Sequence, residues 1–324
     1  LKFLPKYANR LPANIAPPKP RRSRFIVKSS AKGSFITYIM IMNMLESSKV
    51  VDIFLRYDVS KTSDTSKYKL TELKGITNSS FIVEVDNKKF VLRIPGENPD
   101  VINRQSEKHN TLLVQEEGLT LPFIIFDEEN GIKISEYYEI YTYKDTDFND
   151  SVLRNNAFQE LKKLHNSEII FQNNFKPTEV FINIADESNP LEQEAKEAGL
   201  QVVKKLNEIG LDEKPCHQDL YSGNFVVFKD KTLLIDWEYS SMGDSYFDYA
   251  DLFWQNNFET NKDLKNKSLD ELGISTTDEV EKFEYFEILS MITWGLWAMR
   301  RSPNNNDGEM SINSALKKVN NKKP

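Results

Sequence analysis

The first half of the chain alternates apolar and polar residues in short runs separated by turn residues. Asp86-Asn87 lies between two such runs and is typical of a hairpin turn. Val101–Glu117 instead carries apolar residues at helical spacing. The short runs predict strands at Tyr68–Leu73, Ser80–Val85, Phe90–Ile94, Leu121–Phe126 and Ile132–Ile134.

The second half changes to longer stretches with helical periodicity. Two short apolar runs, Phe225–Phe228 and Thr232–Ile235, are the exception and predict a strand pair around Lys229–Lys231. The tail from Ser302 is polar and is expected to be loose. The helical stretches are Ser151–His165, Glu192–Ile209, Phe247–Trp254 and Val280–Met299.

The amino-terminal stretch differs in charge from the rest. Residues 1–45 contain no acidic residue, and basic residues precede the apolar run Phe35–Leu45. This arrangement occurs in signal and transit peptides, but Met40, Met42 and Met44 are also plausible starts, which favours an over-extended or disordered leader. The apolar run is shorter than the roughly 20 residues that span a bilayer, so no stable membrane insertion is expected.

Composition narrows the class of protein. The 324 residues are 39% hydrophobic and 28% charged, as in soluble globular chains. The net charge of -7 argues against nucleic-acid binding, which needs a basic surface. The single cysteine, Cys216, allows no intrachain disulfide and is consistent with a cytoplasmic location. The oligomeric state is left open.

One motif carries the chemistry. Cys216 to Asn224 contains His-x-Asp, four residues and Asn, and Asp236 follows Asn224 by 12 residues. Phosphoryl transfer needs a carboxylate beside the attacking hydroxyl, together with an amide oxygen and a second carboxylate that hold magnesium. The predicted strand pair returns Asp236 to the same side as Asp219 and Asn224. The motif therefore predicts a kinase that uses ATP and Mg²⁺.

These residues, with several others, resemble the choline/ethanolamine kinase family. The likeness is closest to the bacterial choline kinases of the lic operon type, within the aminoglycoside phosphotransferase and protein-kinase-like superfamily. It extends from Leu70 to Arg301, and Asp236-Trp-Glu-Tyr-Ser240 is its most specific marker. The other markers are Leu73–Asn78, Val91–Gly96, Ile102–Arg104 with Glu107, Leu161–His165 and Trp294–Trp297.

The resemblance implies an α+β, protein-kinase-like fold with two lobes. Residues 46–136 would form a small β-rich lobe that binds nucleotide, and 137–301 a large helical lobe with the catalytic and substrate sites. The polar tail would be 302–324. The chain would cross between the lobes near Glu136–Glu139, where backbone groups would meet adenine.

The resemblance also assigns roles to individual residues. Asp219 would be the catalytic base, and Arg93 would pair with Glu107 and hold phosphate in place of the usual lysine. The metal ligands would be Asn224, Asp236 and Glu238. The ATP-binding residues would be Gly75, Thr77, Asn78, Arg93, Glu107 and Tyr137. His165 and His217 are expected to be structural.

The substrate implied is choline, whose hydroxyl would receive the phosphate to give phosphocholine. A quaternary ammonium donates no hydrogen bond and is held by aromatic faces. Trp294 and Trp297 lie three apart on a predicted helix and share a face, and Tyr221 and Tyr239 would be their neighbours.

Two departures concern this substrate site. No aromatic residue follows Ser302, where family members supply another wall, and Gln255 replaces a carboxylate of eukaryotic relatives. Ethanolamine, an aminoglycoside or another amino alcohol is therefore an alternative acceptor, and an ATP-binding pseudoenzyme is a third interpretation. A protein kinase is disfavoured because Asp236-Trp-Glu stands in place of Asp-Phe-Gly.

Overall fold

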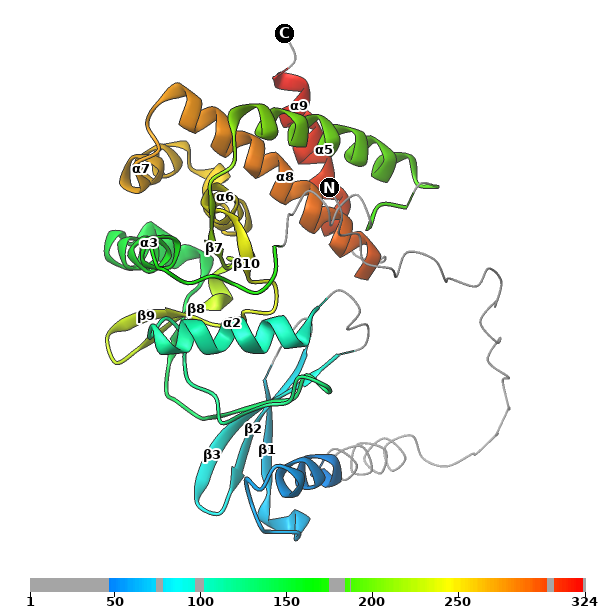
Figure 1. The fold of residues 1–324 in the computed structure, drawn as a ribbon, viewed down its shortest axis with the longest axis vertical. Coiled ribbons are helices and arrows are strands. Elements are labelled where there is room, and N and C mark those ends of the chain that lie inside the picture. The colour runs from blue at the N-terminus through cyan, green and yellow to red at the C-terminus, as the bar shows by residue number, and fades with distance from the viewer. Residues whose placement is uncertain are drawn as a thin grey trace, which may run out of the picture.

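The computed structural model describes residues 47–73, 78–96, 102–174, 184–186, 188–301 and 306–322. They form a smaller lobe built on an antiparallel sheet and a larger, mostly helical lobe (Figure 1). The predicted α+β, two-lobed architecture is confirmed. The predicted leader, 1–45, lies outside the described residues.

The sheet of the smaller lobe has the order β1-β2-β3-β5-β4. Asp86 and Asn87 have φ of 51° and 59° and close the β2–β3 hairpin, as the sequence predicts. The predicted run Leu121–Phe126 forms a ladder only at its end, Ile125–Phe126, because Pro122 has no N–H to donate. The strands are β1 Lys69–Leu73, β2 Asn78–Val85, β3 Lys88–Pro95, β4 Ile125–Phe126 and β5 Lys133–Glu136.

Two helical segments cover this sheet. Residues 47–56 are helical and bury Val50, Val51 and Phe54 against the strands. Helix α2, Arg104–Glu116, lies across the boundary between the lobes (Figure 1). Its Asn110 donates a hydrogen bond from Nδ2 to the carbonyl oxygen of Ser240 at 2.9 Å. Helix α2 therefore connects the small lobe to the segment that follows Asp236.

The chain passes from one sheet to another just after β5. Strand β5 ends at Glu136, and β6, Tyr141–Thr142, already pairs with β8 of the larger lobe. The passage thus overlaps the predicted crossing at Glu136–Glu139. The backbone N–H of Tyr137 donates to the carbonyl of Lys89 at 3.0 Å, which keeps the start of the passage on the small lobe.

The larger lobe contains six helices among the described residues and two small antiparallel sheets. The sheets are formed by β6, β8 Phe225–Phe228 and β9 Lys231–Leu234, and by β7 Glu213–Cys216 with β10 Ser241–Asp244. The short 3-10 helices are η1 Thr65–Lys67 (in the small lobe), η3 Asp145–Asn149, η4 Ser222–Asn224 and η5 Phe258–Thr260. The helices are α3 Ser151–His165, α5 Pro190–Ile209, α6 Ser245–Gln255, α7 Lys262–Leu272, α8 Thr277–Arg301 and α9 Asp307–Asn321.

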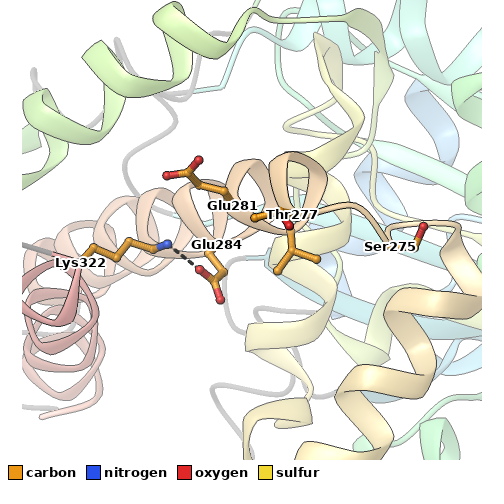
Figure 2. A pocket seen from close by; sticks show the side chains of 6 residues that line it. Ser275, Thr277, Glu281, Glu284 and Lys322 are labelled. Carbon is orange, nitrogen blue, oxygen red and sulfur yellow. Dashed lines mark hydrogen bonds and ion pairs between the residues drawn. The ribbon is translucent and has the colours of Figure 1, made fainter.

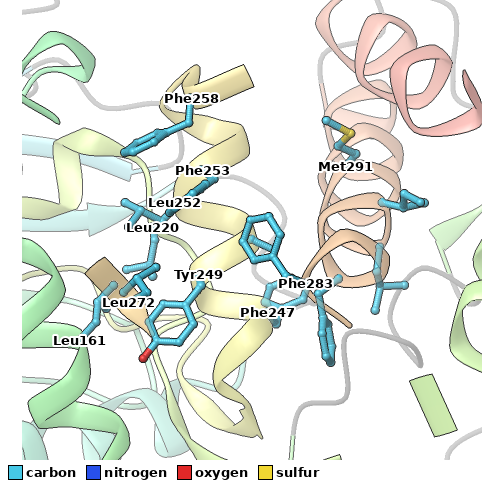
Figure 3. Packing of buried hydrophobic residues seen from close by; sticks show 14 of the residues in the cluster. Leu161, Leu220, Phe247, Tyr249, Leu252, Phe253, Phe258, Leu272, Phe283 and Met291 are labelled. Carbon is cyan, nitrogen blue, oxygen red and sulfur yellow. The ribbon is translucent and has the colours of Figure 1, made fainter. Parts of the chain in front are cut away.

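The core of the larger lobe centres on α6. Phe253 stacks on Phe258 with ring centroids 4.4 Å apart, and Phe283 of α8 meets its edge at 5.1 Å. Phe247 and Met291 extend the contact along the two helices (Figure 3). Burying such aromatic side chains contributes roughly 1.5–3 kcal/mol each. The core therefore fixes α6, which carries polar groups of the site.

The carboxyl-terminal tail is not loose, and the expectation from its polarity was wrong. Residues 307–321 form α9, whose Ile312, Ala315 and Leu316 share one face and are buried. Helices α8 and α9 approach so closely that a Cβ on Gly295 would lie 2.8 Å from Ile312 Cγ1. Three apolar residues at helical spacing are enough to dock α9, because Gly295 of α8 has no side chain and leaves room for Ile312.

Helix α7 and strands β6, β7 and β10 were also not predicted. They are short, and the hydrogen bonds of β7 and β10 form only because residues 25 or more positions apart meet, as in the pair Cys216 and Ser241. No helix among the described residues is long and apolar enough to cross a membrane.

Candidate active site

The predicted motif residues meet in one loop region. Asp219 and Asn224 lie between β7 and β8, and Asn224 donates from Nδ2 to the backbone oxygen of Asp219 at 2.8 Å and to its Oδ2 at 3.2 Å. The N–H of Ile235 donates to the carbonyl of Asn224 at 3.0 Å, which brings Asp236 alongside. The strand pair β8–β9 thus returns Asp236 to the loop, as the spacing predicts.

The loop has a strained backbone that suits small or polar residues. Gln218 and Asp236 have φ of 69° and 65°, in the left-handed region. A Cβ on Gly223 would lie 2.2 Å from the ring of Tyr221, so only glycine allows this packing. Such backbone strain persists where the surrounding structure holds it.

Two carboxylates of α6 provide that support. Asp248 accepts hydrogen bonds from the backbone N–H groups of His217 at 2.9 Å and Gln218 at 2.7 Å. Asp251 accepts from the N–H of Leu220 at 2.7 Å. Both residues are fully buried. Sequence reasoning missed them, although two acidic residues three apart in an otherwise apolar helix are a usable signal.

The histidines brace the same loop. His217 Nε2 lies 2.9 Å from the carbonyl of Ile235, and the N–H of Asp219 donates to His217 Nδ1 at 3.3 Å. Burial lowers the pKa of His217, so it stays neutral at pH 7. His165 Nε2 lies 2.8 Å from Asp248. Both histidines are placed as structural residues, and Cys216 is buried and free.

Asp219 lies in an environment that favours proton acceptance near neutral pH. Burial raises its pKa to about 7, and the charges of Asp251 and Asp236 act in the same direction. Gln255 donates from Nε2 to Asp219 Oδ1 at 3.2 Å and to Asp251 Oδ2 at 2.9 Å. Gln255 therefore contacts the base itself and places a neutral amide between two carboxylates.

A second group of charges lies where the small lobe faces Asp236. Arg93 Nη2 lies 2.5 Å from Glu107 Oε1, and Arg93 Nη1 lies 2.9 Å from Asp236 Oδ1. Arg104, which sequence reasoning did not select, bridges Glu107 at 2.6 Å and Glu238 at 3.2 Å. We call Arg93, Arg104, Glu107, Asp236 and Glu238 the arginine cluster.

The arginine cluster is largely removed from water, which shifts its titration. Burial opposes the charge of Arg93, but Glu107, Asp236 and Glu238 outweigh it and raise the pKa of Arg93. Burial and the charge of Asp236 raise the pKa of Glu238 to about 7. Arg93 is therefore a permanent cation among groups of variable charge.

Lys133 is a further cation beside this cluster that sequence reasoning missed. It is the cross-strand partner of Arg93 in the β3–β5 pair. Its Nζ lies 5.6 Å from the ring centroid of Phe126 and 5.7 Å from that of Phe123. Burial and the charge of Arg93 lower its pKa to about 8. The pattern offered one signal, since Lys133 directly follows Ile132 in an apolar strand.

The side chains present could hold a divalent cation. Carboxylate oxygens of Glu107, Asp236 and Glu238 lie within 4.8 Å of one another. Because Asn224 turns its NH₂ group toward Asp219, its amide oxygen is left as a ligand atom. Carboxylate and amide oxygens are the ligands that magnesium prefers. The residues therefore fit the predicted metal, although Arg93 pairs with Asp236 in this state.

The predicted nucleotide-binding residues are only partly described. Gly75 and Thr77 lie outside the described residues. Asn78 Nδ2 lies 3.4 Å from Glu238 Oε2, so it faces the arginine cluster. The N–H of Tyr137 is occupied by Lys89, and Lys89 Nζ lies 5.8 Å from the ring centroid of Tyr137. Any adenine contact of Tyr137 would therefore use a group other than its N–H.

Three of the four predicted aromatic residues form a connected wall, whereas Tyr221 makes no ring contact with them among the described residues. Tyr239 meets Trp294 edge to face at 5.1 Å, and Trp294 meets Trp297 at 5.7 Å. The indole N–H of Trp294 is buried without a hydrogen-bond partner among the described residues. Burial raises the pKa of Tyr221 to about 12, aided by the charge of Asp219. We call Tyr239, Trp294 and Trp297 the aromatic wall.

A separate pocket of about 460 Å³ lies beside α8, on its amino-terminal half (Figure 2). Lys322 of the tail forms an ion pair with Glu284 at its edge. Its lining contains neither a motif residue nor a residue of the aromatic wall, so it is not the predicted site. The lining residues are Ser275, Thr277, Val280, Glu281, Glu284 and Lys322.

Comparisons with known proteins agree with this arrangement. Protein LicA of Haemophilus influenzae is 31% identical over 189 residues, which is 56% of this chain and 56% of LicA. The Protein LicA homolog of Mycoplasma capricolum is 30% identical over 110 residues, covering 31% of this chain and 43% of the homolog. The matched region thus spans about half the length of these curated relatives.

Solved structures extend the likeness to the whole fold. The choline kinase LicA from Streptococcus pneumoniae matches with a TM-score of 0.72 at 26% identity, over 86% of this chain and 99% of LicA. The aminoglycoside phosphotransferase APH(4)-Ia matches with a TM-score of 0.63 at 16% identity, over 86% of this chain and 100% of its own, and shares the fold alone. The predicted kinase-like fold is thereby confirmed.

The family model described as choline/ethanolamine kinase matches residues 71–283, which include the catalytic loop, the arginine cluster and the whole of α6. The chain therefore belongs to the choline/ethanolamine kinase family.

Proposed function

We propose that this protein transfers the γ-phosphoryl group of ATP to the hydroxyl of choline, giving phosphocholine. The observation that carries the proposal is the convergence of Asp219, Asn224 and Asp236 at one loop, next to the cation Arg93. Family membership and the choline kinase named among the similar structures support the choice of reaction. The cytoplasm, where ATP is abundant and cysteines stay reduced, is the proposed location.

Asp219 would accept the proton of the acceptor hydroxyl. With its pKa raised to about 7 by burial, its carboxylate is a stronger base than an exposed aspartate and is still substantially ionised at neutral pH. Gln255 and Asn224 each donate to one of its oxygens, which fixes the carboxylate plane. Orientation of this kind favours attack in line with the transferred phosphoryl group.

The nucleotide would lie between the lobes. A similar structure, LicA in complex with AMP, supports the binding of a nucleotide. Asn224 and Asp236 would hold magnesium, with Glu238 as a further ligand, and the metal would neutralise charge on the phosphates. Arg93 would then exchange Asp236 for a phosphate oxygen while Glu107 keeps it oriented. Asn78 and the loop residues Gly75 and Thr77 would complete the nucleotide site.

The aromatic wall supports choline over other acceptors. Tyr239, Trp294 and Trp297 offer aromatic surface of the kind that holds a trimethylammonium group, worth roughly 0.5–2 kcal/mol per favourable contact. The unpaired indole N–H of Trp294 is a donor, and a donor does not help a primary ammonium, which needs acceptors. Ethanolamine, an aminoglycoside and an ATP-binding pseudoenzyme remain the alternatives to test.

The test is ATP consumption with magnesium on choline, ethanolamine and kanamycin in parallel. A kcat/KM for choline at least tenfold above the other two would support the proposal. A preference for ethanolamine or kanamycin would keep the chemistry and replace the acceptor. Nucleotide binding without turnover on all three would favour the pseudoenzyme. Phosphocholine should be identified directly by ³¹P NMR, so that ATP hydrolysis by water is not counted.

A further inference from the structure

Arg301, the last residue of α8, lies on the aromatic wall. Its guanidinium carbon Cζ is 5.2 Å from the ring centroid of Trp297. Trp294, Trp297 and Arg301 are spaced three and four residues apart, so they project from one face of the helix. The preceding Arg300 points elsewhere, is exposed, and reaches toward the carbonyl of Ile184 at 3.5 Å.

The guanidinium uses the same attraction that a quaternary ammonium would use. The electron-rich face of an indole ring attracts any cation within about 6 Å of its centroid, and arginine is the commonest protein partner. A guanidinium can in addition stack as a plane on an aromatic face, which a lysine ammonium cannot do. In the state described, the aromatic surface of Trp297 is therefore already in contact with a positive charge.

The ring that Arg301 covers belongs to a connected set of aromatic contacts. Trp297 meets Trp294 at 5.7 Å, and Trp294 meets Tyr239 at 5.1 Å. Arg301 therefore lies at one end of the aromatic wall, and Tyr239, three residues after Asp236 in the chain, lies at the other.

We propose that Arg301 is a specificity-determining residue that competes with the cationic group of the acceptor for the aromatic wall. This proposal rests on the proposed function. If the substrate approaches the ring face that Arg301 covers, the arginine must move away. If the substrate uses the other face, Arg301 still draws on the same ring and repels the incoming charge. Both arrangements weaken the binding of a cation, so the sign of the effect does not depend on the face.

Helix α9 packs beside this part of α8 without adding an aromatic ring. It contacts α8 through Ile312 and Gly308, and its residues Asp307–Asn321 include no aromatic side chain. A cation held by one aromatic wall has a modest affinity, which Arg301 reduces further.

The experiment compares Arg301→Gln with the matched control Arg300→Gln. Tetramethylammonium is the probe for the wall, because it has the cation without the hydroxyl, and its binding is followed by tryptophan fluorescence. For Arg301→Gln we expect the dissociation constant of tetramethylammonium and the KM for choline to fall about three- to tenfold, with kcat unchanged. Arg300→Gln should leave both at the wild-type value.

Arg301→Lys is a second, more conservative variant that controls for a folding defect in Arg301→Gln. It keeps the charge and loses the planar stack, so a smaller fall of about twofold is expected. A rise in the dissociation constant of tetramethylammonium or in the KM for choline, in either variant, would overturn the proposal. So would unchanged constants in Arg301→Gln when its melting temperature is also unchanged. If the dissociation constant of tetramethylammonium changes as expected but choline is not phosphorylated, only the proposed function is rejected. If no variant binds tetramethylammonium, the role of Arg301 is rejected.

Discussion

The carboxylates on the two sides of the candidate active site differ in their partners. In the arginine cluster, Glu107, Asp236 and Glu238 are paired with Arg93 and Arg104. On the loop side, Asp219 and Asp251 have no arginine or lysine partner among the described residues and receive only N–H and O–H donors. We call Asp219, Asp248 and Asp251 the loop carboxylates.

The difference assigns two kinds of chemistry to the two sides. Paired charges can be exchanged for other charges, so the arginine cluster is suited to a metal ion and phosphates. Asp219 and Asp251 have no cationic partner among the described residues, and burial raises the pKa of each to about 7. Burial also raises the pKa of Glu238 to about 7, but Glu238 is held by Arg93 and Arg104. The loop side is therefore suited to accepting a proton at neutral pH.

The largest expected effect is the loss of the base. Asp219→Asn keeps the shape and the hydrogen bond from Gln255 but cannot accept the substrate proton. We expect kcat to fall about 10²- to 10⁴-fold, with the dissociation constant of ATP changed less than about threefold. Steady-state kinetics and calorimetry measure the two quantities.

Asp230→Asn is the matched control for that variant. Asp230 is an exposed turn residue with φ of 62°, a conformation that asparagine adopts readily. Its kcat should equal that of the wild type. Activity retained in Asp219→Asn would remove Asp219 from the mechanism and with it the contrast between the two sides.

A smaller effect is expected from Arg93→Lys. The planar fork of Arg93 holds Glu107 and Asp236 at once through Nη2 and Nη1, whereas an ammonium is a single point charge. We expect kcat/KM to fall about 10- to 100-fold, because lysine keeps the charge but cannot hold both carboxylates in position at once. The measurement is kcat/KM at saturating magnesium.

Arg154→Lys tests whether this loss is specific to the site. Arg154 is buried and forms a bidentate pair with Glu271 through two 2.8 Å contacts, so the chemistry of the substitution is the same. Its melting temperature should fall while kcat stays within twofold of the wild type. Equal kinetic losses in both variants would mean that Arg93 supports the fold only.

The pH dependence sharpens the comparison further. With the pKa of Asp219 at about 7, activity should fall as the pH drops through 7, because the protonated acid cannot act as a base. Asp251→Asn removes a neighbouring negative charge and lowers the pKa of Asp219, so the acid limb should move about one unit to lower pH. The measurement is log kcat as a function of pH from about 5 to about 9, a range that brackets the pKa of Asp219.

Gln255→Glu should act in the opposite direction. It adds a carboxylate between Asp219 and Asp251, which raises the pKa of Asp219 and moves the acid limb to higher pH. If the acid limb of the profile lies at the same pH in both variants as in the wild type, the assignment of this pH dependence to Asp219 is contradicted.

The smallest effect on activity is expected for Lys133→Met. Lys133 lies next to Arg93 and its pKa is lowered to about 8, chiefly by burial. Between pH 8 and about 10 the unfolded chain binds a proton at this lysine that the folded chain does not, so stability should rise with pH across that window. The melting temperature of the wild type should therefore rise relative to that of Lys133→Met.

The same variant should change kcat at pH 7 less than about threefold, because Arg93 stays in place. A melting difference that does not vary with pH would mean that Lys133 is exposed to solvent in both states. A loss of kcat as large as that caused by Arg93→Lys would mean that Lys133 contributes to the reaction as directly as the residues of the arginine cluster.

Local pattern was sufficient for much of the fold. The helix at Ser151–His165 and the strand at Phe225–Phe228 have the predicted bounds, because each carries its full period within its own residues. The Asp86-Asn87 turn was predictable because both residues tolerate positive φ. The order and spacing of Asp219, Asn224 and Asp236 were enough to predict a phosphoryl-transfer site.

What the sequence could not determine depends on partners that lie far away along the chain. The tail from 302 reads as polar, but α9 forms because Gly295 opens a place for Ile312 on α8. Asp251 reads as one polar residue of an apolar helix, and only the fold brings it to Leu220 and Gln255. The sequence by itself determined the kinase motif, the order of the small lobe's strands along the chain and the helices that carry their own apolar period, such as Ser151–His165. The tertiary structure decided which carboxylates are paired and which stay basic, because burial and charge pairing are properties of three-dimensional neighbours.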